Sequence, residues 1–178
     1  MTRSIDVAAF IENRPLGWFQ IRVLLVCLGV AITEGYDIQM VGYVIPFIAK
    51  DWHLGRAAFG PLFSIGIVGL LCGSLLFGLL ADRYGRRKMV ILCTLLYSAM
   101  TLATALATSL TPLLVLRFLS GVGVGGAIPN LIALMVEYSP RRNRSFMATF
   151  IQCGIAIGSA TVGLAVAPLL PHFGWQSA

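Results

Sequence analysis

The 178-residue sequence has little charge and few of the side chains that most enzymes use in catalysis. Asp, Glu, Lys and Arg make up 11% of the residues, about half of their share in a typical soluble domain. Its two histidines, His53 and His172, are far apart in the chain, and no serine lies in a Gly-x-Ser-x-Gly motif. These absences argue against a soluble domain and against an enzyme.

Cysteine is also scarce, and its spacing does not suggest a metal site or a redox pair. No Cys-x-x-Cys motif occurs, and every cysteine lies within an apolar run. We therefore expect the four thiols to be small buried hydrophobic groups. They are Cys27, Cys72, Cys93 and Cys153.

Long apolar runs dominate the chain instead, since 58% of its residues are hydrophobic. Five segments each reach the roughly 20 residues that a helix needs to cross a ~30 Å hydrocarbon core. Because hydrocarbon offers the backbone no hydrogen-bond partners, each segment is predicted to be an α-helix. The sequence thus indicates an all-α integral membrane protein, with a cytoplasmic segment over residues 1–20 and a transmembrane part over 21–178. The predicted helices are 21–48, 57–81, 89–108, 112–136 and 146–170.

Basic residues indicate the orientation of these helices. They gather near the start of the chain and in the gaps after the second and fourth helices, whereas the gap after the first helix holds two and the gap after the third none. Because Lys and Arg favour the cytoplasmic side, the N-terminus is predicted to lie inside. The net charge of +6 is then explained by topology and anionic lipid, and nucleic acid is not an expected partner.

Three charged residues fall inside the apolar segments: Glu34, Asp37 and Arg117. Each would cost about 2.5–3.5 kcal/mol if left unpaired at the centre of a membrane helix. Glu34 and Asp37 are three residues apart and share one face of the first helix. Two carboxylates so close cannot both ionise cheaply in a dry site, so at least one is expected to hold a proton.

The depth of these charges predicts which of them pair. At a rise of about 1.5 Å per residue, Asp37 lies about 4 Å and Arg117 about 10 Å on the outer side of the midplane, with Glu34 near the centre. The long Arg117 side chain can extend along this distance to Asp37. We therefore expect an Arg117–Asp37 pair, with Glu34 free to carry a proton. The alternative is an ion pair that only fastens the first helix to the fourth.

Small and polar residues mark further helix faces. Gly121 and Gly125 form a small-x-x-x-small pattern that allows another helix to approach closely, and two similar pairs lie on the second and fifth helices. The run that includes Gly121 also matches the nucleotide motif G-x-G-x-x-G, but no strand-helix-strand context surrounds it. Asn130 and Gln152, like Gln39, either hydrogen-bond a neighbouring helix or line a substrate cavity. The similar pairs are Gly69 with Gly73 and Gly154 with Gly158.

The loop between the second and third helices resembles the pattern G-x-x-x-D-[RK]-x-G-R-[RK]-[RK] of major facilitator transporters. Within that superfamily the chain resembles the aromatic acid:proton symporters. Glu34-Gly35-Tyr36-Asp37 is similar to their D-G-[FY]-D signature, with Glu in place of the first Asp. Arg117, Gly121 and Gly125 resemble the R-x-x-x-G-x-x-x-G motif of the fourth helix. The matching loop residues are Gly78, Asp82, Arg83, Gly85, Arg86, Arg87 and Lys88.

This resemblance implies the N-terminal half of a six-plus-six helix transporter in a bacterial inner membrane, truncated before its sixth helix. Such a protein carries an aromatic carboxylate together with a proton, needs no other cofactor, and works by alternating access. Glu34, Asp37, Arg117, Asn130 and Gln152 are then the candidate residues for proton coupling and substrate binding. The basic loop would act as a gate, together with an acid and a base at the inner ends of the fourth and fifth helices. These two residues are Glu137 and Arg144.

The sequence is also compatible with other functions. A drug:proton antiporter would share the loop and Arg117, but it usually carries a Gly-Pro motif in its fifth helix, and residues 154–163 contain no proline. A carrier of sugars or other organic acids would fit the loop equally well, although acids in the first helix favour proton coupling. A truncated remnant that only inserts into the membrane is a further possibility.

Overall fold

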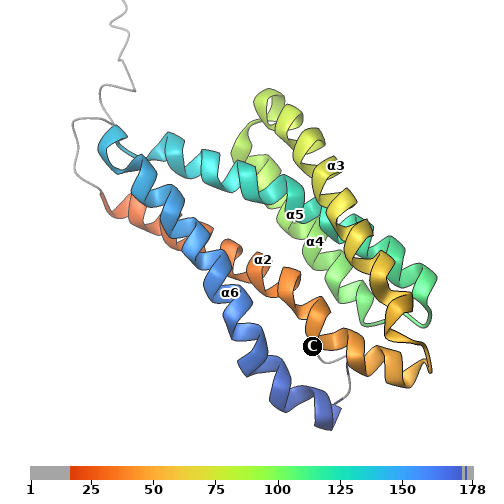
Figure 1. Ribbon diagram of the computed structural model, residues 1–178. Helices are drawn as coiled ribbons and strands as arrows, with labels where there is room; N and C mark the ends of the chain where they lie inside the picture. The colour runs from red at the N-terminus through yellow and green to blue at the C-terminus, as the bar shows by residue number, and fades with distance from the viewer. Residues whose placement is uncertain (1–16, 174, 176–178) are drawn as a thin grey trace, which may run out of the picture.

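The computed structural model describes residues 17–173 and residue 175, and these residues form a bundle of long helices without a β-strand. The predicted all-α fold is thus confirmed for this part of the chain (Figure 1). Most of the predicted segment 1–20 lies outside the described residues. The helices are α2 (Trp18–Asp51), α3 (Gly60–Tyr84), α4 (Arg86–Thr104), α5 (Leu110–Tyr138) and α6 (Arg144–Phe173), with short 3-10 turns at Arg56–Phe59 and Arg141–Asn143.

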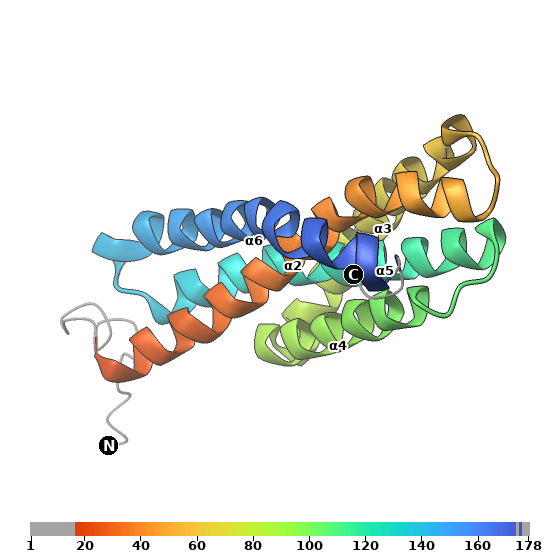
Figure 2. The same cartoon turned by 90° about the horizontal axis from the view of Figure 1, so that it is seen from below.

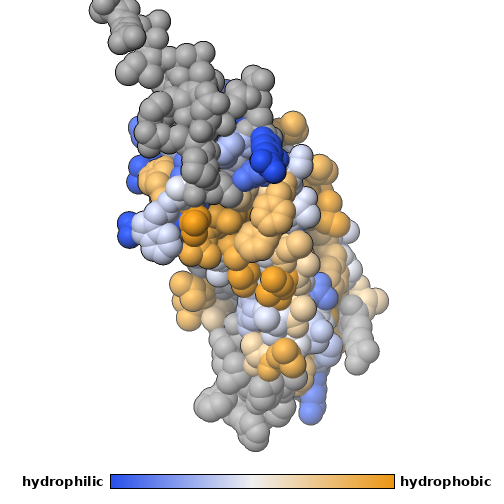
Figure 3. All heavy atoms as spheres, turned by 90° about the vertical axis from the view of Figure 1, so that its left-hand side faces the viewer, coloured by the Kyte–Doolittle hydropathy of each residue, from blue (hydrophilic) through white to orange (hydrophobic). Residues whose placement is uncertain are grey.

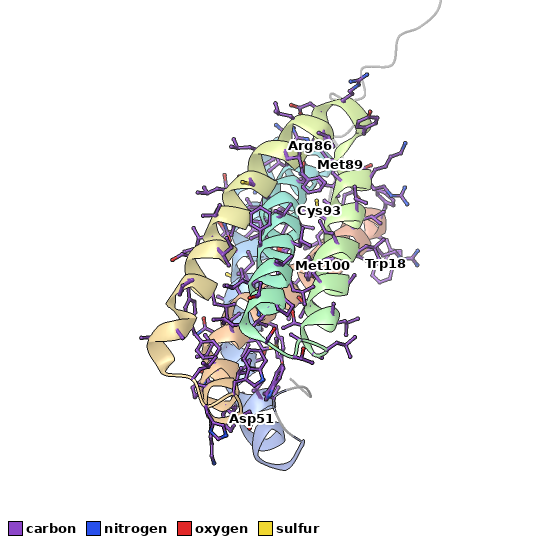
Figure 4. The ribbon with its side chains drawn as sticks, turned by 90° about the vertical axis from the view of Figure 1, so that its right-hand side faces the viewer. Trp18, Asp51, Arg86, Met89, Cys93 and Met100 are labelled. Atoms are coloured by element: carbon purple, nitrogen blue, oxygen red, sulfur yellow. The ribbon has the colours of Figure 1, made fainter. Side chains whose placement is uncertain are left out.

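The helices pack in two groups along a common long direction. α5 lies between α3 and α4 and packs along both, while α2 packs along α6 (Figure 2). Contacts of α5 with α2 and α6 are fewer, so the two groups meet along a thinner seam. Arg86, at the start of α4, and Asp51, at the end of α2, lie at opposite ends of the bundle (Figure 4). This antiparallel course is the one that the alternation of basic and non-basic gaps predicts.

The predicted basic loop is shorter in the structure than the sequence suggested. α3 continues through Asp82 and Arg83 to Tyr84, and α4 begins at Arg86. The turn between them is therefore the single residue Gly85, whose φ of 92° strains any residue with a Cβ. Arg83 lies in the last turn of α3, where its positive charge interacts favourably with the helix dipole.

Helix ends differ elsewhere from the sequence prediction by a few residues. The first helix is three residues longer at each end than the predicted 21–48, and the third ends at Thr104 instead of residue 108. Among the described residues, three helical stretches are long and apolar enough by themselves to cross a membrane: Ala57–Tyr84, Leu110–Tyr138 and Arg144–Val166. The other two long helices, α2 and α4, complete the bundle beside them.

The close packing of α3 on α5 depends on the glycines of the predicted small-x-x-x-small patterns. A Cβ on Gly73 would overlap the backbone carbonyl of Val122, and one on Gly125 would overlap that of Leu70. The predicted close approach is confirmed, and the structure adds that the two glycine faces oppose each other. Such contact brings Cα–H groups against carbonyl oxygens and compensates for the missing hydrophobic drive between helices in lipid. α2 and α6 meet in the same way, at Gly158 against the backbone of Ile32.

Replacing Gly73 with alanine is expected to destabilise the bundle, because the new methyl group must push α5 away along its length. Overpacking of this kind typically costs about 1–3 kcal/mol. The matched control is Gly78→Ala on the same helix, where a Cβ meets no atom within 4 Å. In detergent micelles, Gly73→Ala should unfold at a lower temperature than the unsubstituted protein. Gly78→Ala should not lower the unfolding midpoint. Equal midpoints for the two variants would contradict this account of the interface.

Apolar side chains cover much of the outer surface, as expected for a protein surrounded by lipid. Leu75 and Leu79 of α3 are 72% and 73% exposed. Figure 3 shows apolar residues spread over the middle of one face, with the most hydrophilic residues nearer its ends. The cysteine prediction is half wrong: Cys27 and Cys93 are buried, but Cys72 and Cys153 are exposed. An apolar surface accepts a thiol as readily as an apolar core does.

Candidate site within the helix bundle

A buried ion pair joins the two groups of helices. The Nη1 atom of Arg117 on α5 donates a hydrogen bond to Oδ2 of Asp37 on α2, over 3.0 Å. Both residues are buried, with 8% and 4% of their surface exposed. The pair that the depth estimate predicted is therefore present. Its position on the seam between α2 and α5 means that any relative movement of the two groups must strain or break it.

Two hydroxyl groups complete the surroundings of the Asp37 carboxylate. Thr101 of α4 donates to Oδ1 over 2.7 Å, and Ser120 of α5 donates to Oδ2 over 3.3 Å. With Arg117, three donors from two helices thus hold this carboxylate. Sequence reasoning missed both hydroxyls: Ser120 could have been found, because it lies three residues after Arg117 and shares its face. Thr101 gave no signal, because only the packing of α4 brings it to Asp37.

Glu34 lies one turn from Asp37 but in a very different environment. It is 0% exposed, and neither of its carboxyl oxygens has a hydrogen-bond partner among the described residues. On α4, the Tyr97 hydroxyl is hydrogen-bonded to the Thr33 hydroxyl at 2.7 Å. A charge buried without a partner costs several kcal/mol. The two acids of the first helix therefore differ in their partners. Within the part of the chain that the structure describes, Asp37 is held by three donors and Glu34 by none.

A pocket of about 320 Å³ opens beside the ion pair, between α2, α3 and α5. Asp37, Arg117 and Ser120 form its charged and polar end, and Gln39 of α2 is a further polar residue in its wall. The wall contributed by α3 is apolar and includes Phe63. An apolar pocket with a few convergent polar groups is the usual form of a small-molecule site.

The structure does not bring all five predicted site residues together. Asn130 is buried, and its Nδ2 donates to the backbone carbonyls of Phe77 at 3.3 Å and Gly126 at 2.8 Å, so it fastens α5 to α3. Gln152 lies on the exposed face of α6. Neither residue lines the pocket beside the ion pair, whereas Gln39 does. The position of a polar residue along a helix gives its depth, but only packing decides which way it faces.

Arg86, one of the predicted gating residues, lies at the opposite end of the bundle from Asp51 (Figure 4). Arg86 forms an ion pair with Glu137 of α5, with 2.6 Å between Nε and Oε1, and a longer one of 3.8 Å with Asp82. The Nε atom of Arg144 donates to the backbone carbonyl of Ser139, which closes the turn between α5 and α6. The other basic residues of this region have exposed side chains. They are Arg83, Arg87 and Lys88.

A second cavity, of about 380 Å³, lies between α2, α4 and α5 near this basic end. Arg22 and Arg87 line it, together with Phe19 and Tyr138, whose rings lie 5.8 Å apart. It contains neither Glu34 nor the ion pair. The ion pair lines the smaller pocket, whereas Glu34 lines neither cavity.

An apolar helical bundle with a buried ion pair and a basic turn at one end is the architecture of an integral membrane protein. The sequence model described as Major Facilitator Superfamily matches residues 27–178. The chain belongs to this superfamily.

Three relatives of this chain are transporters that are named for aromatic acids. The chain is 42% identical to the gallate transporter of Pseudomonas putida over 173 residues, which is 97% of this chain and 38% of the relative. It is 40% identical to the 4-hydroxybenzoate transporter PcaK of Pseudomonas aeruginosa over 173 residues, 97% of this chain and 39% of the relative. It is 42% identical to the 3-(3-hydroxy-phenyl)propionate transporter of Escherichia coli over 154 residues, 85% of this chain and 37% of the relative. The chain thus spans less than two-fifths of the length of these relatives.

Proposed function

We propose that this chain is the N-terminal part of a transporter that carries small aromatic carboxylates together with protons across a bacterial inner membrane. Its N-terminus would face the cytoplasm, and residues 21–178 would form most of a first half that works with a C-terminal half. The relatives support the substrate class, because each is named for transport of an aromatic acid or its hydroxylated derivative.

The observation that carries the proton coupling is the contrast between Asp37 and Glu34. Asp37 is held by Arg117 and two hydroxyls, so its negative charge is compensated. Glu34 is fully buried and has no such partners among the described residues. A carboxyl group that gains or loses a proton there changes the local charge by a full unit in an apolar surrounding, where electrostatic interactions are strong. We therefore assign the coupling proton to Glu34.

Arg117 has a matching role toward the substrate. It is the basic residue in the wall of the pocket, and an aromatic acid is an anion at neutral pH. Its guanidinium carries five N–H donors, of which the structure shows one engaged with Asp37. An arriving carboxylate can thus share Arg117 with Asp37 or compete for it. Competition would weaken the seam between the two helix groups, and so would link binding to movement.

Alternating access would then consist of rocking of the two halves about this pocket. At the basic end, the Arg86–Glu137 pair ties α4 to α5, so that the turn at Gly85 moves with the bundle. Asp82 is three-quarters exposed and is free to meet the positive end of a helix in the other half. We propose that this contact closes the cytoplasmic side.

Uptake measurements in cells that produce the complete transporter, with this chain as its N-terminal part, test the proposal. Labelled 4-hydroxybenzoate, benzoate and 3-phenylpropionate should accumulate, and an uncoupler that dissipates the proton gradient should abolish the accumulation. Control cells carry the empty vector. Uptake that proceeds equally with and without the uncoupler would refute proton coupling, and failure to take up any of the three acids would refute the substrate class.

A further inference from the structure

We infer that Gln39, together with the apolar wall of α3, recognises a hydroxyl group on the aromatic ring of the substrate. This inference rests on the proposed function, because it assigns a part of the same pocket to a part of the same ligand. It makes Gln39 a specificity-determining residue for hydroxylated acids over their unsubstituted counterparts.

The pocket wall has four polar residues, and three of them already hydrogen-bond one another: Asp37, Arg117 and Ser120. Asp37 accepts from Arg117 and Ser120 within the wall and from Thr101 behind it. Gln39 lines the same pocket, has an exposed side chain, and has no hydrogen-bond partner among the described residues. Its amide offers both donors and an acceptor, which is the combination that a phenolic hydroxyl requires.

The apolar residues in the wall of this pocket also suit an aromatic ring. Gly66 of α3 and Gly121 of α5 lie in the wall of the pocket and present no side chain to it. Phe63 and Ile67 flank them on α3 and are 51% and 61% exposed. A wall made of residues without side chains and of exposed apolar side chains suits the face of an aromatic ring, which would bury its surface there.

The two charged side chains of the pocket are paired with each other, and Gln39 is uncharged. Arg117 attracts a carboxylate, whereas the amide of Gln39 is neutral and gains little from one. A ring that directs its carboxylate toward Arg117 therefore leaves its substituents to contact the remaining wall, where Gln39 is the polar residue. The volume of about 320 Å³ is at the lower end of ligand pockets and suits an acid with a single ring.

The test is the ratio of kcat/KM for 4-hydroxybenzoate to that for benzoate, measured by uptake in cells producing the complete transporter. Gln39→Leu is expected to lower this ratio about five- to tenfold, the effect of losing one uncharged hydrogen bond. Uptake of benzoate should persist, since benzoate has no ring hydroxyl to lose a partner. Gln39→Met, which keeps the length of the side chain, should give the same shift if Gln39→Leu fails to reach the membrane.

The matched control is Gln152→Leu, the same chemical change on the exposed face of α6, outside the pocket. It should leave the ratio at the wild-type value. An unchanged ratio in both Gln39 variants would overturn the inference, as would an equal loss of uptake for the two acids, because a role independent of the hydroxyl would then explain it. If the wild-type transporter takes up none of 4-hydroxybenzoate, benzoate and 3-phenylpropionate, the proposed function itself fails, and this outcome is distinguishable from the others.

Discussion

Replacing Asp37 with alanine is expected to lower the free energy of unfolding by about 3–5 kcal/mol, because it leaves a buried charge without its partner. Arg117 is only 8% exposed, so water cannot easily take the place of the lost carboxylate. Thr101 and Ser120 would lose their acceptor at the same time. Because the pair lies on the seam between the helix groups, the loss should also appear as separation of α2 and α6 from the rest of the bundle.

The double variant Asp37→Ala with Arg117→Leu is the decisive control for this prediction. Removing both charges leaves no uncompensated ion, so the double variant is expected to be more stable than Asp37→Ala alone. Unfolding in detergent micelles, followed by circular dichroism, measures both. Transport by the complete protein should be lost in the double variant, since the proposed substrate site needs Arg117. If the double variant is as unstable as the single one, the pair does not act as the structure indicates.

Replacing Glu34 with glutamine is expected to abolish proton-driven accumulation of substrate while leaving the protein folded and inserted. Glutamine keeps the size of the side chain but cannot release or bind a proton. Exchange of labelled for unlabelled substrate across the membrane needs no net proton movement, and it should therefore continue. Glu34→Asp, which retains a carboxyl group, should preserve coupling. Accumulation that still collapses with an uncoupler in the Glu34→Gln variant would show that another group carries the proton.

Glu34 is expected to lower the stability of the bundle although the proposed transport function needs it. Both carboxyl oxygens of Glu34 are buried without partners among the described residues. Replacing an unsatisfied buried polar group by an apolar one of similar size removes a penalty of about 1–3 kcal/mol. Glu34→Leu is thus expected to raise the thermal unfolding midpoint in detergent micelles while eliminating coupled uptake. A lower midpoint would instead indicate that Glu34 has a structural partner that stabilises the bundle.

Much of the fold could be predicted from the sequence because membrane insertion imposes simple rules. The lengths of the apolar runs identified the helices to within a few residues, and the spacing of charges along them predicted the Asp37–Arg117 pair. Depth follows from counting residues, since the rise of a helix is nearly constant. The glycine pairs likewise predicted close contacts between helices, which the structure shows at Gly73 and Gly125.

What the sequence could not decide was which way each side chain faces. In a soluble protein, polarity distinguishes the inside of a helix from the outside, but lipid and the interior of this bundle are both apolar. Leu131 is 0% exposed and Leu75 is 72% exposed, although the two residues are chemically identical. The same ambiguity explains why Asn130 bonds backbone carbonyls and Gln152 faces outward.

The sequence by itself therefore determined the class of protein, the course of its helices and the charges that need partners. Tertiary structure alone decided that Thr101 reaches Asp37 and that Gln39 lines the pocket beside the ion pair. The physical reason is that the first set depends on energies counted along one helix, such as the cost of each charge in hydrocarbon. The second depends on contacts between helices, which no periodicity within a single apolar segment encodes.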